Sequence, residues 1–129
     1  MPLKTAVGQT RGIRRAQNFF RRKERALKIG LIGNGAIAKL VTKFCAERPD
    51  RFTIVGALGL PVDQVSVGRH PVVQSWAALR ALGPELVVEC AGHSAVRAYG
   101  TQVLDAGIDL VVVSTGSLAD ADLWRDLKA

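Results

Sequence analysis

The chain has few of the features that mark a secreted, metal-binding or membrane-spanning protein. Its 129 residues include only two cysteines, Cys45 and Cys90, which exclude a disulfide framework and suit a reducing cytoplasm, where we expect the protein. They have no metal-ligand spacing, so we expect no metal site. No apolar run reaches the roughly 20 residues of a transmembrane helix, so we expect no membrane contact. Repeats and low-complexity tracts are absent, and the length suits one domain with a hydrophobic core.

The formal net charge of +7 is confined to the first 26 residues. Residues 1–26 contain eight basic residues and one acidic residue, whereas basic and acidic residues balance in 27–129. We interpret 1–26 as a flexible or helical extension without a function of its own. A transit-like peptide and a basic arm that binds nucleic acid are the alternatives, and we do not expect nucleic-acid binding. Near-helical spacing would allow part of it to form an amphipathic helix, through Ile13, Ala16, Phe20 and Leu27.

A glycine-rich turn joins a strand pattern to a helix pattern near the start of the neutral part. The apolar run 27–32 is typical of a buried parallel strand, and 36–47 has helical periodicity. Between them, Gly33 would allow a tight turn and Gly35 would let the backbone approach a diphosphate, while Ala38 lets the helix pack closely. Such glycines also occur in ordinary turns, but both flanks favour nucleotide binding. The motif predicts phosphate contacts from Gly33, Asn34, Gly35, Ala36 and Ile37, at a helix N-terminus that attracts anions.

The acidic residue that usually binds the adenosine ribose is missing. The second strand, 52–58, ends at Leu58 and is followed by Gly59, while Asp63 comes later, beyond a proline. The next arginine along the chain, Arg69, also lies well past this strand end. We include Leu58 in the cofactor site and expect the site to accept NAD or NADP, because no acid repels a 2′-phosphate.

Strand and helix patterns alternate along the rest of the chain. We predict strands at 27–32, 52–58, 70–73, 85–90 and 109–113, and helices at 36–47, 76–82, 93–105 and 119–128. Ser75 is the expected N-cap of the second helix. The alternation predicts a Rossmann-type α/β fold, a doubly wound parallel sheet of order 3-2-1-4-5 with helices on both faces. The nearly continuous apolar strand 109–113 should be buried on both faces.

Ligands of such sheets bind beyond the carboxyl ends of the strands. Three small, glycine-bearing turns, 33–38, 90–93 and 114–116, should meet there. The first would hold the diphosphate. The other two would line the nicotinamide and its ribose, with Cys90, Ala91, Gly92, His93, Ser114, Thr115 and Gly116.

Three motifs together resemble the amino-terminal domain of the L-aspartate dehydrogenase family: GNGAI at 33–37, VVECAG at 87–92 and DLVVVSTGSL at 109–118. The resemblance covers about 27–129. It implies an NAD- or NADP-dependent oxidoreductase that converts L-aspartate through an imine to oxaloacetate and ammonia, with hydride transfer to nicotinamide C4. The imine can feed NAD biosynthesis. The family also implies a homo-oligomer and a second domain, which supplies the catalytic histidine and much of the substrate pocket.

We expect that second domain to be absent here, so that 27–129 form a cofactor-binding domain that is inactive alone. The three turns carry no Arg or Lys to hold a dicarboxylate, which agrees with this view. His93 is the one candidate catalytic residue, but we expect it to bond a backbone group or the cofactor ribose at its helix N-terminus. We interpret Cys90 as a small apolar filler rather than a nucleophile.

The sequence also allows three other interpretations of the function. The domain could belong to a sister enzyme such as homoserine dehydrogenase or dihydrodipicolinate reductase. It could be a nucleotide-binding module without catalysis, or a nucleic-acid-associated protein that uses its basic arm.

Overall fold

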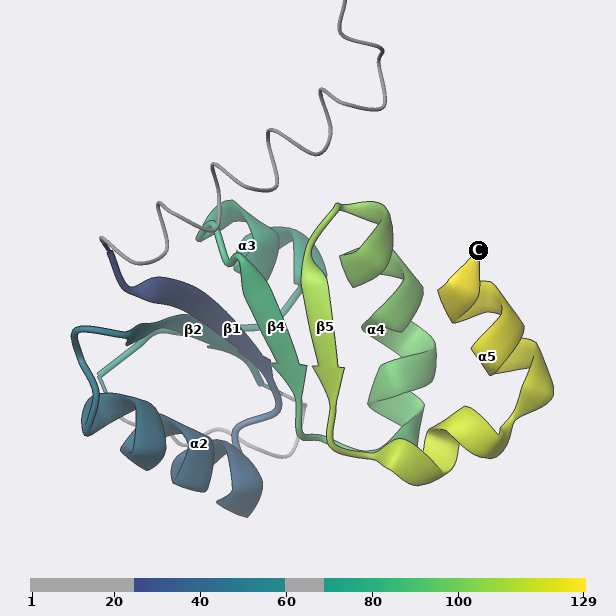
Figure 1. The fold of residues 1–129 in the computed structure, drawn as a ribbon, viewed down its shortest axis with the longest axis horizontal. Helices are drawn as coiled ribbons and strands as arrows, with labels where there is room; N and C mark the ends of the chain where they lie inside the picture. Colours follow the sequence, from purple (N-terminus) through teal and green to yellow (C-terminus); the bar gives the residue numbers. More distant parts are fainter. Residues whose placement is uncertain (1–24, 60–68) are drawn as a thin grey trace, which may run out of the picture.

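The computed structural model describes residues 25–59 and 69–129. Their strands form one parallel sheet with helices packed against it (Figure 1). The basic segment 1–24 and the segment 60–68 with Asp63 lie outside the described residues. The strands are β1 (Leu27–Ile32), β2 (Phe52–Leu58), β3 (Val72–Val73), β4 (Leu86–Glu89) and β5 (Asp109–Val112). They are ordered β3-β2-β1-β4-β5, and each neighbouring pair is parallel. The predicted fold class and strand order are confirmed.

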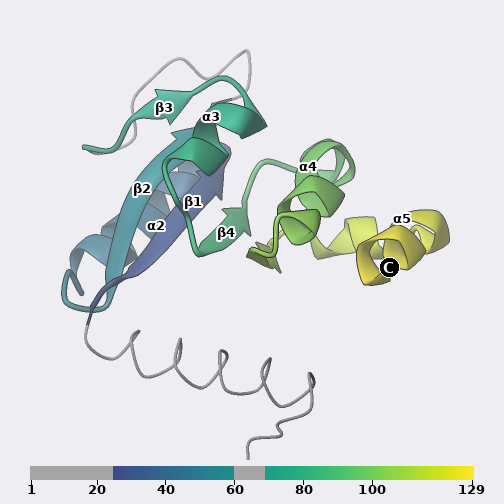
Figure 2. The same cartoon turned by 90° about the horizontal axis from the view of Figure 1, so that it is seen from above.

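Helices cover both faces of this sheet. They are α2 (Ala36–Ala46), α3 (Trp76–Ala81), α4 (His93–Asp105), the 3₁₀ helix η1 (Thr115–Ala119) and α5 (Ala121–Lys128). Successive side chains of a strand point to opposite faces. Leu31 of β1 therefore packs with Ala38 and Cys45 of α2, whereas Ile32 packs on the other face with Leu79 of α3 and Val103 of α4. Helix α5 packs on α4 at the end of the molecule away from β2 (Figures 1 and 2).

Most element boundaries lie within two residues of those predicted, and local side chains explain them. Ser75 caps α3 as predicted, because its Oγ accepts a hydrogen bond from the Ala78 N–H at 3.1 Å. The predicted last helix, 119–128, is instead divided. Asp120 accepts from the N–H groups of Asp122 and Leu123 and starts α5 one residue later, while the preceding residues form η1.

The prediction that β5 is buried on both faces is wrong. Val111 is 45% exposed and Val113 is 40% exposed. Both lie on the face that carries α2, and α2 packs on β2 rather than β5. Since β5 also ends the strand order, no described element covers it from that side. An apolar strand sequence therefore predicted the strand but not its neighbours.

An ion pair lies just before β4, at the end of the strand that is far from the turn leading to α4. The Arg25 guanidinium donates to both carboxylate oxygens of Glu85, at 2.7 and 3.0 Å. Arg25, which we assigned to the basic extension, thus contacts the residue that precedes β4.

No helix of the described residues combines the length and the apolarity that crossing a lipid bilayer requires.

The α3 cap provides a test of the fold. Ser75→Ala removes the Oγ acceptor, so we expect the free energy of unfolding to fall by about 1 kcal/mol. Ser94→Ala is the matched control, because Ser94 is exposed in the first turn of α4 and its side chain caps nothing among the described residues. Its unfolding free energy should change by no more than about 0.5 kcal/mol. Urea unfolding followed by circular dichroism measures both. Equal losses in the two variants would contradict the capping assignment.

Candidate cofactor site

Three turns lie side by side at the carboxyl edge of the sheet, at the lower edge of Figure 1. The backbone ladder aligns them beyond the ends of the strands. The Gly33 N–H donates to the Leu58 carbonyl at 2.8 Å, and the Cys90 N–H donates to the Ile32 carbonyl at 3.0 Å. The Val113 N–H then donates to the Glu89 carbonyl at 3.0 Å. Together these bonds bring the turns after β1, β4 and β5 to one place, as the sequence predicted.

Gly33 is required where the first two turns touch. Its φ is +107°, a conformation that side chains rarely adopt. A Cβ at this position would lie 3.0 Å from the Ala91 Cβ and 3.2 Å from the Cys90 carbonyl oxygen. The backbone after β1 therefore approaches the turn after β4 more closely than any other residue would allow.

Gly35 has the opposite surroundings. In the described part of the chain, and leaving out its neighbours in sequence, no heavy atom lies within 4 Å of the position that a Cβ would occupy. Gly35 is also the N-cap residue of α2, whose first turn has no side-chain cap and no acidic residue among the described residues. Uncapped N–H groups next to open space suit an oxyanion. The residues here thus fit a diphosphate, and a Cβ would fill part of its place.

The Glu89 side chain joins the turns after β4 and β5, although the sequence did not predict it as a site residue. Its side chain is 1% exposed. Oε1 accepts hydrogen bonds from the N–H groups of Ala91 and Gly92, both at 2.8 Å, and from the Ser114 Oγ at 2.9 Å. Oε2 accepts from the Ser114 N–H at 3.1 Å. A charged residue at the end of an apolar strand, before a small residue and a glycine, was the signal that could have revealed it.

His93 lies over the same pair of turns from the first position of α4. Its Cε1 and Nε2 are each 3.0 Å from the place of a Cβ on Gly116. The imidazole is exposed and makes no hydrogen bond within the described residues. Among the described residues, no carboxylate is hydrogen-bonded to His93 to orient it as a general base.

Cys90 is held as a thiol. Its Sγ donates to the Ile32 carbonyl at 3.3 Å, and burial together with the nearby Glu89 charge raises its pKa to about 11. A nucleophilic cysteine requires the thiolate, which this environment disfavours. The surroundings support the interpretation of Cys90 as a packing residue.

The remaining predicted residues take different positions. The side chain of Leu58 is buried in the core, so this residue borders the glycine turn through its backbone carbonyl. Asn34 is also buried, whereas Ile37 of α2 is 43% exposed. Thr115 and Gly116 are exposed at the start of η1. The described residues contain no group of three or more His, Cys, Asp or Glu side chains placed to bind a metal ion.

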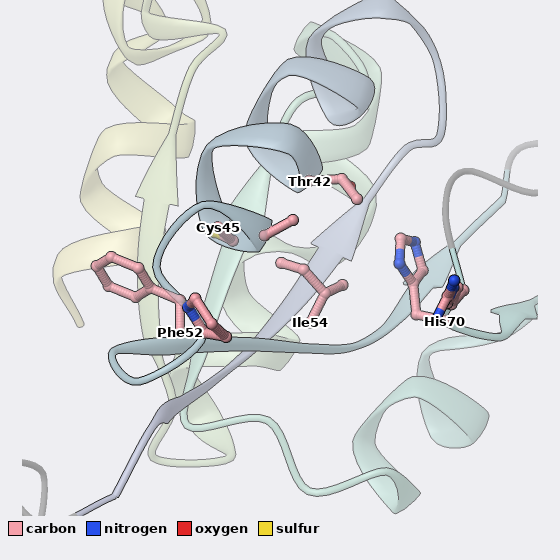
Figure 3. A pocket seen from close by; sticks show the side chains of 8 residues that line it. Thr42, Cys45, Phe52, Ile54 and His70 are labelled. Atoms are coloured by element: carbon pink, nitrogen blue, oxygen red, sulfur yellow. The ribbon is translucent and has the colours of Figure 1, made fainter.

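A separate hollow of about 370 Å³ lies between α2 and β2 (Figure 3). Its lining includes Thr42, Cys45, Phe52, Ile54 and His70. The Thr42 Oγ1 and His70 Nε2 atoms are buried there without a hydrogen-bond partner in the described residues. Burial lowers the pKa of His70, which keeps its imidazole neutral near pH 7. The hollow faces the last turns of α2 and the start of β2, so it is distinct from the glycine turn.

The family model described as "Homoserine dehydrogenase, NAD binding domain" matches residues 30–129. The chain belongs to this family of NAD-binding domains. Its predicted cofactor, NAD or NADP, is thereby confirmed.

Individual relatives of the NAD-binding domain carry a different enzyme name. This chain is 42% identical over 94 residues to L-aspartate dehydrogenase 1 of Bordetella parapertussis, and the match covers 73% of this chain and 36% of that protein. It is 38% identical over 104 residues to L-aspartate dehydrogenase of Ruegeria pomeroyi, covering 79% and 37%. The chain thus spans little more than a third of the length of these relatives. The resemblance drawn from the three motifs is confirmed.

A solved structure shows the same fold. The crystal structure of aspartate dehydrogenase from Thermotoga maritima superposes with a TM-score of 0.62 at 19% sequence identity. The match covers 81% of the NAD-binding domain and 42% of that chain.

The state of Cys90 leads to a prediction about its reactivity. With a pKa of about 11, the folded protein should contain little thiolate at pH 8, and alkylation of Cys90 should be roughly a hundredfold slower than in the unfolded chain. The rate should rise with pH up to about 11, because the thiolate fraction rises. Iodoacetamide labelling with peptide mapping separates Cys90 from Cys45. Rapid labelling of folded Cys90 at pH 8 would contradict the packing role.

Proposed function

We propose that residues 27–129 hold NAD or NADP with the diphosphate at the N-terminus of α2, contacted by Gly33, Asn34, Gly35, Ala36 and Ile37. The observation that carries this proposal is the open space at Gly35 beside the uncapped first turn of α2. The segment 1–26 then lies outside the cofactor-binding unit.

Charge supports α2 rather than α4 as the diphosphate site. Both helices begin at the same edge of the sheet after a glycine N-cap. Next to α4, however, the buried Glu89 carboxylate already accepts from the N–H of Gly92, the N-cap residue. A resident carboxylate repels a second anion in a poorly solvated place, whereas the first turn of α2 contains no acid.

The nicotinamide end then lies along the turns after β4 and β5. We assign its contacts to Cys90, Ala91, Gly92, His93, Ser114, Thr115 and Gly116. When bound, the dinucleotide supplies a hydride acceptor at nicotinamide C4. The domain itself binds and orients the cofactor through backbone groups and small side chains, which let the substrate approach the ring.

We further propose that the whole enzyme is an L-aspartate dehydrogenase that acts in the cytoplasm. Its relatives carry that name, and the three turns offer no Arg or Lys for a dicarboxylate. The substrate groups and a catalytic acid or base therefore come from a second domain. Homoserine dehydrogenase is the second candidate, because the matching family model carries that name.

Apolar surfaces around β5 support a second domain or subunit. Val111 of β5 and Val113 just after it are exposed on one face of the sheet, and Trp124 of α5 is 45% exposed near the other face. Beside Trp124 lies a groove of about 380 Å³, with a lining that includes Leu104, Leu110, Val112, Leu118 and Leu127. Apolar surface of this kind usually marks an interface. We propose that the second domain covers it and that the full enzyme is a homo-oligomer.

The diphosphate site is tested by Gly35→Ser. A serine is a good N-cap, so the unfolding free energy should stay within about 0.5 kcal/mol of the parent value. Its side chain fills the open space and can bond the α2 N–H groups, so the Kd for NADH should rise at least about tenfold. Titration of NADH fluorescence measures the affinity.

Gly33→Ala is the matched comparison for that variant. Because of the positive φ and the contact with Ala91, it should destabilise the fold by about 1 to 3 kcal/mol. Unchanged NADH affinity in Gly35→Ser would reject the assigned diphosphate site.

The proposal that this chain binds the cofactor, while a second domain supplies the substrate groups, is tested with the 129-residue chain itself. We expect NADH to bind, and we expect no NADH formation from NAD with either L-aspartate or L-homoserine, because the substrate groups are elsewhere. Absorbance at the wavelength of the reduced nicotinamide measures turnover. Formation of NADH from L-aspartate by this chain alone would show that it is more than the cofactor-binding half.

A further inference from the structure

The Glu89 carboxylate connects the turns after β4 and β5 through hydrogen bonds. These turns belong to neighbouring parallel strands, and the ladder between the strands ends where the Val113 N–H donates to the Glu89 carbonyl. Beyond that point the chain diverges into α4 on one side and η1 on the other. The Glu89 side chain crosses the gap: Oε1 accepts from the N–H groups of Ala91 and Gly92 and from the Ser114 Oγ, and Oε2 accepts from the Ser114 N–H.

We infer that Glu89 is a positioning residue for the nicotinamide end of the cofactor site. It sets the distance and orientation between the two turns on which the nicotinamide and its ribose would lie, and it does so from behind the site rather than by touching the reacting atoms. This inference rests on the proposed function, because the turns matter only if the nicotinamide binds there.

Burial makes this connection specific to a carboxylate. The side chain is 1% exposed, and within the described residues its two oxygens accept from three N–H groups and one hydroxyl. A glutamine has nearly the same shape, but its NH₂ group would face N–H donors and leave at least one of them without an acceptor. A buried unpaired donor is costly, so the turns would move apart or admit water.

The diphosphate end provides an internal reference. The residues assigned to the diphosphate, 33–37, precede or begin α2, whereas the Glu89 carboxylate accepts its hydrogen bonds from the turns after β4 and β5. A ligand with the adenosine and the diphosphate but no nicotinamide should therefore bind independently of Glu89. ADP is such a ligand, whereas NADH engages both ends.

The test compares the two ligands in Glu89→Gln. We expect the Kd for NADH to rise about tenfold and the Kd for ADP to change less than twofold, with a lower fluorescence yield of the bound reduced nicotinamide. Glu85→Gln is the matched control: the same substitution at the opposite end of β4, where the carboxylate bonds Arg25. It should leave both affinities unchanged.

The outcomes separate the inference from the proposed function. Equal weakening of NADH and ADP in Glu89→Gln would show a general structural role and overturn the inference, as would unchanged affinity for both. If the parent chain itself fails to bind NADH, the proposed function fails first.

Ser114→Ala tests the same connection even where Glu89→Gln does not fold. It removes one donor to Oε1 and leaves the Ser114 N–H in place, so we expect a two- to fivefold loss that is confined to NADH. In the double variant the two losses should combine to less than their product, because both substitutions act on the hydrogen bonds between Glu89 and Ser114. Unchanged NADH affinity in Ser114→Ala, or independent losses in the double variant, would overturn the inference.

Discussion

The close approach of Gly33 to Ala91 and Cys90 is the constraint on which the site depends. It is a contact between the turns that follow two adjacent strands, β1 and β4, and it leaves no room for a side chain on the first of them. Because the backbone turns there with a positive φ, the chain leaves β1 at once and starts α2 three residues later. The N–H groups of α2 consequently face the carboxyl edge of the sheet beside the other two turns. A wider turn would move the helix N-terminus away from them.

Electrostatics then distinguishes the two ends of that edge. The first turn of α2 has no acid and no side-chain cap among the described residues, whereas the turn before α4 contains a buried carboxylate that its own backbone satisfies. The turn before α4 thus already holds a negative charge, whereas the first turn of α2 holds none among the described residues. This asymmetry gives the proposed dinucleotide a direction along the edge, from the diphosphate at α2 towards the nicotinamide at β4 and β5.

The surface around β5 differs from the rest of the sheet. β1 is covered by α2 on one face and by α3 and α4 on the other, while Val111 of β5 and Val113 just after it are exposed. The chain spans little more than a third of the relatives that it matches. Exposed apolar side chains at the strand next to the nicotinamide turns are what a cofactor domain would present to a substrate-binding partner.

The sequence by itself determined the alternation of strands and helices, the strand order and the glycine turn, because these follow from hydrophobic periodicity and from the backbone freedom of Gly33. It also identified Ser75 as a cap, since a hydroxyl before a helix has one common use. It did not reveal the role of Glu89, because the donors that surround a carboxylate come from residues 2, 3 and 25 positions away. Nor did it reveal the exposure of β5, since an apolar strand has the same pattern whether its neighbours are present or not. Those two features were decided by tertiary structure, which alone determines which segments meet.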